Sequence, residues 1–378
     1  LTRHFVSAHS DADAASRTVG RLYAINTFGA VVGVFTCSFV LLPRFGVQVA
    51  NTLAASTNFA LAALILLLRR LSPATATQQH SAAPITTRAP GLPRALRIAA
   101  ALSFAGSGFS SLLYEVVWSR ALVNTIGGSL YSFALILTTF LVGIGAGSAL
   151  LSGLFAERVR PLRLAAIGAS AACLLVLAPL AVHLSLWLAG AALALALLAI
   201  TSGALFARSK AARMALFVEH DATLDERSSA LRLLVVPCLL ALGALAQRTD
   251  RLSAISCAVV LAICGFLALL LLTYQRPLAS VIGLQIYIAA CTWMSTAFAD
   301  ELSLTFASMV APLYEQLPER VGTVQTFMFL TAALCVLPSA LAMGAVFPAS
   351  LRAWTSGGRA IASDVGVVYA GNTLGSIF

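Results

Sequence analysis

Residues 129–155 read SLYSFALILTTFLVGIGAGSALLSGLF, a stretch without a single charged side chain. An α-helix needs about 20 apolar residues to cross a bilayer, and this stretch is long enough. Comparable stretches recur along the chain, at 22–42, 48–68, 98–118, 164–182, 184–206, 232–247, 253–274, 278–298 and 324–347, and another begins near 366. Runs of this length without period-two alternation exclude a β-barrel. The sequence therefore predicts an all-α, polytopic membrane helix bundle.

The composition supports lipid as the main solvent. Hydrophobic residues make up 60% of the 378 residues and charged residues only 10%, whereas a soluble domain carries roughly 25% charged residues. The net charge of +10 raises the alternative of nucleic-acid binding. However, the basic residues lie between the apolar runs, as the positive-inside rule describes. We therefore expect the lipid bilayer as a partner and no nucleic acid.

The basic residues also predict the orientation of the helices. Alternate connections hold 19 of the 24 Arg and Lys residues, and these connections are 1–21, 69–97, 157–163, 207–232, 275–277 and 349–364. Short cytoplasmic loops carry the excess of Arg and Lys. We therefore expect a multi-pass protein, with Leu1 in the cytoplasm and the acidic loop 299–323 outside.

A repeated motif indicates an internal duplication. Residues 19–32, VGRLYAINTFGAVV, match residues 365–378, VGVVYAGNTLGSIF, at seven of fourteen positions. Both copies are predicted to run in the same direction, as in the parallel halves of major-facilitator proteins. We therefore expect the last two helices of a first repeat at 1–68, a basic Pro- and Ala-rich cytoplasmic linker at 69–97, and a second repeat at 98–378. That second repeat stops in its penultimate or last helix, so we expect a fragment of a longer protein.

Three segments carry a resemblance to a known family. They are 107–164, which contains YEVVW, the turn MGAVFPASLR at 343–352, and 19–46, which contains YAINTFG. Together they resemble the membrane region of bacterial fused spermidine-synthase-like proteins, in which a major-facilitator-like bundle precedes a cytoplasmic aminopropyltransferase domain. The resemblance implies that the protein lies in the bacterial inner membrane, that such a synthase domain is a partner in cis and that the complete protein acts on polyamines.

The apolar composition leaves no room for that soluble catalytic domain in this chain. No catalytic residue can therefore be assigned, and we expect the fragment to be non-catalytic, without a cofactor. The seven cysteines form no CxxC pair and the five histidines no HExxH motif, so no metal site is expected. Two alternatives remain open: a major-facilitator-like transporter of a polyamine or another small cationic solute, and a membrane anchor or scaffold.

The candidate polar site starts from Glu115, the acidic residue inside a predicted membrane helix. A carboxylate in hydrocarbon is a functional candidate by default. Because the predicted helix ends near 118, Glu115 is placed at the outer interface, where Arg120 is available as an ion-pair partner. The two interpretations are an interfacial ion pair and a site for a cation or proton.

The repeat supplies further candidates. Tyr23 and Asn26 share one helix face, as do Tyr369 and Asn372, and we expect all four to face the protein interior. They serve either interhelical hydrogen bonding or substrate contact. Small residues allow helices to approach closely, which predicts packing at the pairs Gly29 and Gly33, Gly143 and Gly147, and Gly371 and Gly375.

Overall fold

A computed structural model describes residues 12–71, 94–155, 251–297, 321–354 and 361–377, with short pieces within 164–169, 229–242 and 304–307. This part of the chain is helical and contains no β-strand. The predicted helices 164–182, 184–206 and 232–247, the linker 69–97 and the loops 207–232 and 299–323 lie largely or wholly outside the described residues.

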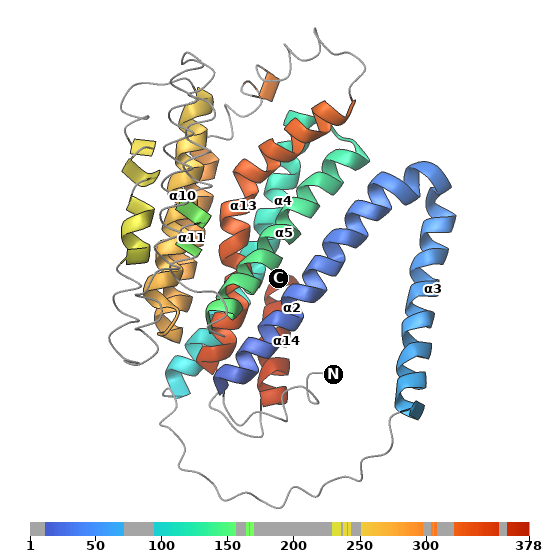
Figure 1. Ribbon diagram of the computed structural model, residues 1–378, viewed down its shortest axis with the longest axis horizontal. Coiled ribbons are helices and arrows are strands. Elements are labelled where there is room, and N and C mark those ends of the chain that lie inside the picture. Colours follow the sequence, from blue (N-terminus) through green and yellow to red (C-terminus); the bar gives the residue numbers. More distant parts are fainter. Residues whose placement is uncertain are drawn as a thin grey trace, which may run out of the picture.

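The described helices are the elements that Figure 1 shows: α2 (Ala12–Thr36), a π-helical segment η1 (Cys37–Leu41), α3 (Leu42–Leu71), α4 (Arg94–Ile126), α5 (Leu130–Phe155), α10 (Arg251–Thr273), α11 (Pro277–Ala297), α13 (Val321–Trp354) and α14 (Ile361–Ile377). Five helical stretches among them are long and apolar enough to cross a membrane: Thr18–Leu68, Ile98–Ile126, Leu130–Leu154, Pro277–Thr296 and Cys335–Trp354. The prediction of a helical membrane protein is therefore confirmed.

Helices α2 and α3 form an open hairpin whose sharp bend lies at Gly46. The sequence predicts two separate helices here, but helical turns continue through η1 and into α3. The chain reverses where Gly46 adopts φ 74° and ψ 179°, a left-handed backbone conformation that favours glycine. In Figure 1, α3 stands apart from the other helices after this bend.

A tight turn joins α4 to α5. Gly127 follows α4 with φ 91°, and its N–H donates to the carbonyl of Val123 at 2.9 Å. The hydroxyl of Ser129 then accepts the backbone N–H of Ser132 at 3.1 Å and so caps the start of α5. Helix α4 therefore ends at Ile126, directly before this turn. The sequence predicts that it ends earlier, near 118.

Helix α13 is the centre of the bundle, and it packs chiefly on α5, α11 and α4. Its crossing with α5 depends on glycine. A side chain at Gly147 would meet the backbone of Leu341, and one at Gly344 would meet the backbone of Ile144. Gly143 likewise lies against Ala340. The two backbones thus approach as closely as small residues permit.

Glycines also allow α14 and α4 to pack closely where they cross. A side chain at Gly375 would meet the backbone of Ala105, and one at Gly108 would meet Asn372. By contrast, nothing lies within 4 Å of the Cβ positions of Gly29, Gly33 and Gly371. The expectation of close packing at these three glycines is wrong for the described residues, because GxxxG spacing creates a smooth face without determining which neighbour covers it.

Two prolines lie inside α13 rather than at its end. Proline commonly ends or kinks a helix, yet α13 continues through Pro338 and Pro348 to Trp354. In the turn before Pro338, the hydroxyl of Tyr114 on α4 donates to the carbonyl of Cys335 at 2.9 Å. A polar side chain of α4 thus contacts the backbone of α13 close to one of its prolines.

Candidate functional site

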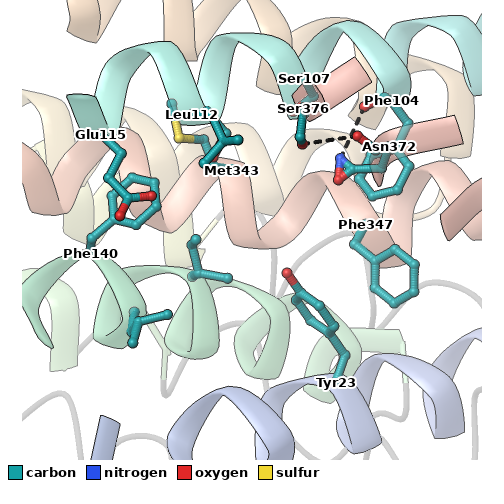
Figure 2. Close-up of a pocket in the computed structure, with 14 residues that line it drawn as sticks. Tyr23, Phe104, Ser107, Leu112, Glu115, Phe140, Met343, Phe347, Asn372 and Ser376 are labelled. Carbon is teal, nitrogen blue, oxygen red and sulfur yellow. Dashed lines mark hydrogen bonds between the residues drawn. The ribbon is translucent and has the colours of Figure 1, made fainter. Parts of the chain in front are cut away.

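A cavity of about 230 Å³ lies between α2, α4, α5, α13 and α14. Figure 2 shows side chains from these helices converging on it. Its described lining is mainly apolar and aromatic, with one carboxylate and a few neutral polar groups; the residues are Tyr23, Phe104, Ser107, Gly108, Ser111, Leu112, Glu115, Phe140, Leu141, Ile144, Met343, Phe347, Asn372 and Ser376.

Glu115 lies deeper than the sequence predicts. Helix α4 continues for eleven residues beyond it, to Ile126, which is about 16 Å at 1.5 Å per residue. Glu115 is therefore well inside the apolar helix rather than at its end. Its side chain is partly buried and lines the cavity.

The expected ion pair between Glu115 and Arg120 does not form. Arg120 is exposed, and no salt bridge joins the two residues, both of which the structure describes. The reason is helical geometry: five residues correspond to a rotation of about 140°, so the two side chains leave α4 in different directions. Among the described lining residues, Glu115 has no cationic partner.

In the first copy of the repeat, Tyr23 is part of the cavity lining and Asn26 is not. Tyr23 lines the cavity, and its ring lies 4.7 Å from that of Phe347 on α13. Asn26 is exposed, so the expectation that it faces the interior is wrong in this structure. Three residues turn a helix by about 300°, which leaves a difference of about 60° in direction. That difference places Asn26 beyond the edge of the buried face.

In the second copy of the repeat, Asn372 is part of the cavity lining and Tyr369 is not. Asn372 lines the cavity, and its amide nitrogen donates to the carbonyl of Phe104 on α4 at 3.4 Å. Tyr369 is 54% exposed, so it departs from the expected interior position. Its ring nevertheless meets the edge of Phe347 at 6.3 Å. The corresponding tyrosines of the two copies therefore contact the same phenylalanine.

Several lining residues were not among those predicted from the sequence. Ser107, Ser111 and Ser376 supply hydroxyl groups to the cavity, and Phe104 and Phe347 supply aromatic rings 5.5 Å apart. Serine and phenylalanine are ordinary in apolar helices, so neither type marks a site by itself. Only the spatial convergence of the five helices identifies them.

The cavity residues belong largely to the repeated motif and to the other segments that suggested a family. Tyr23 and Asn372 come from the two repeat copies, Glu115 from YEVVW, and Met343 and Phe347 from MGAVFPASLR. These segments are far apart in the chain, yet they line one cavity. Comparison with protein-family models, curated proteins and solved structures finds no match for the chain.

Proposed function

We propose that this chain forms a membrane-embedded site for a small organic cation, and that Glu115 is the anionic group that binds it. The observation that carries the proposal is the carboxylate in the cavity, which has no cationic partner among the described lining residues. An unpaired carboxylate in a membrane helix costs several kcal/mol. A bound ammonium group would offset that cost through a charge-assisted hydrogen bond.

The aromatic rings around the cavity suit the same ligand class. Tyr23, Phe104 and Phe347 form a contiguous aromatic cluster, and Phe140 adds a fourth ring to the lining of the cavity. The face of an aromatic ring attracts a cation by about 0.5–2 kcal/mol, the larger values applying where water is excluded. A membrane anchor or scaffold needs only apolar helices, so it gives no account of Glu115.

The resemblance to fused spermidine-synthase-like proteins extends this proposal from the site to the whole protein. The chain would be the non-catalytic membrane region of a spermidine-synthase-like fusion protein, acting as a carrier or receptor for an amine or another small solute. The motifs that suggested the family also line the cavity, which supports the connection. The shared contact of Tyr23 and Tyr369 with Phe347 supports the proposed major-facilitator-like duplication.

Binding to the purified chain tests the cation site. In detergent micelles at neutral pH, isothermal titration calorimetry should show binding of protonated butylamine. Glu115→Gln should weaken that binding at least tenfold, equivalent to about 1.4 kcal/mol, because the amide keeps the shape but lacks the charge. Arg120→Gln is the matched control and should bind like the parent chain, since Arg120 is exposed and outside the cavity.

Two results would contradict the proposal. One is the absence of binding by any primary amine to the folded parent chain. The other is equal affinity in the parent chain and in Glu115→Gln. The first result would favour the anchor or scaffold interpretation, and the second would exclude Glu115 as the group that binds the cation.

A further inference from the structure

The acidic groups of the cavity set the number of positive charges that it can balance. Among its described lining residues, Glu115 is the one carboxylic group, and the remaining polar side chains carry hydroxyls and an amide. A single ammonium group would make the occupied cavity neutral. A second positive charge would remain uncompensated in a largely apolar environment, which is strongly unfavourable.

The end of the cavity opposite Glu115 is also polar. Figure 2 shows Asn372 and Ser376 on that side, separated from Glu115 along α4. The hydroxyl of Ser376 donates to the carbonyl of Asn372 at 3.0 Å, and the amide nitrogen of Asn372 donates to Phe104. With these donors engaged, the oxygen atoms of both side chains remain available as acceptors.

Ser107 strengthens this second polar end. It comes from α4, lines the same cavity and is 4% exposed. Its backbone carbonyl accepts a hydrogen bond from Ser110 at 3.2 Å, and its hydroxyl adds one donor and acceptor to the lining of the cavity. A ligand with a neutral donor and acceptor at its far end can exchange hydrogen bonds with this hydroxyl, which an apolar ligand end cannot do.

The middle of the cavity is apolar, and its volume is small. Leu112 and Met343 lie between the two polar ends in Figure 2, and Ile144 adds another apolar side chain. They suit a short chain of methylene groups. The volume of about 230 Å³ is below the roughly 300–1,000 Å³ of pockets for drug-sized ligands, so the ligand is a small solute.

We infer that the cavity is selective for a singly charged linear amine whose other end is a neutral hydrogen-bonding group, such as an amino alcohol or a mono-acylated diamine. The inference rests on the proposed cation site and narrows its ligand class. It distinguishes this ligand from a fully protonated polyamine, which would bring more positive charge than Glu115 balances.

Three amines with the same four-carbon chain provide the test: butylamine, 4-aminobutan-1-ol and 1,4-diaminobutane. Titrated into the full chain in detergent at neutral pH, 4-aminobutan-1-ol should bind at least fivefold more tightly than either of the others. Butylamine lacks the far hydrogen-bonding group, and 1,4-diaminobutane carries a second charge.

Variants at the far end identify the groups responsible. Asn372→Leu and, independently, Ser107→Ala should reduce the preference for 4-aminobutan-1-ol over butylamine towards one. Ser107→Ala is the smaller change and preserves the packing of α14 on α4. The preference is a ratio within one folded protein, so a difference in the amount of active protein does not alter it.

The outcomes separate this inference from the proposed function. If 1,4-diaminobutane binds most tightly, the charge argument is overturned while the cation site stands. If butylamine and 4-aminobutan-1-ol bind equally, recognition by the far end is overturned and the cation site again stands. If no amine binds, the proposed function fails and this inference fails with it.

Discussion

At the scale of single residues, Glu115 lies in an unfavourable position that no ion pair within the described residues relieves. It projects from an apolar helix into a cavity lined mainly by carbon, and Arg120 points elsewhere. Ligand-free protein therefore carries the desolvation cost of the carboxylate. Binding sites commonly trade stability for function in this way.

A stability measurement on the ligand-free protein checks this cost. Glu115→Gln should raise the free energy of unfolding by about 1–2 kcal/mol, because a neutral amide is easier to desolvate than a carboxylate. Arg120→Gln should change it by less than about 0.5 kcal/mol, as exposed positions usually do. Denaturant titration in detergent micelles gives both values. If the two residues formed an ion pair, both variants would instead be less stable than the parent chain.

At the scale of elements, close helix crossings position the cavity walls. Helix α5 meets α13 through Gly147 and Gly344, and α4 meets α14 through Gly108 and Gly375. These contacts bring the lining residues of α4, α5, α13 and α14 around one space. Van der Waals packing of small residues is the main attraction between helices in lipid, where the hydrophobic effect does not drive association.

Two alanine substitutions test the importance of these crossings. Gly344→Ala should destabilise the protein by about 1–3 kcal/mol, because the added methyl group would collide with the backbone of Ile144. Gly29→Ala is the matched control: nothing lies within 4 Å of its Cβ position, and alanine is favoured over glycine in a helix by about 0.5–1 kcal/mol. Unfolding midpoints in detergent measure the two effects. Equal midpoints for both variants would contradict the crossing described here.

At the scale of the whole molecule, the described helices that are consecutive in the chain alternate in direction, as the charge distribution predicts. The turn at 274–276 and the end of α13 lie at the same end of the bundle, since Arg352 donates to the carbonyl of Tyr274 at 2.5 Å. In Figure 1, the end of α3 and the start of α4 lie towards that end, while the turn between α4 and α5 lies at the other. The described helix ends that flank residues 72–93, the turn at 274–276 and the end of α13 therefore share one end of the bundle.

Cysteine labelling tests the proposed orientation of that end. On a background with the seven native cysteines replaced, Gln78→Cys should be unreactive towards an impermeant maleimide added to intact cells, because we place 69–97 in the cytoplasm. Ser303→Cys, in the acidic loop 299–323, should react under the same conditions. The reverse pattern would show an inverted protein, and reaction at both positions would contradict the alternation itself.

The sequence by itself determined that this is a helical membrane protein and where most described helices lie. Those properties follow from the length and composition of contiguous stretches such as 129–155, which became α5 almost unchanged. The ends of helices were harder to predict: α4 continues past 118 because Gly127, rather than a loss of hydrophobicity, ends it.

Only the tertiary structure decided which polar residues meet. Tyr23, Glu115 and Asn372 line one cavity, whereas Asn26 and Arg120, equally polar and close to them in the chain, do not. The physical reason is that a helix sends side chains in all directions, and spacing alone fixes only their relative angle. Which of those directions faces a neighbouring helix depends on the crossings, and these depend on residues hundreds of positions away.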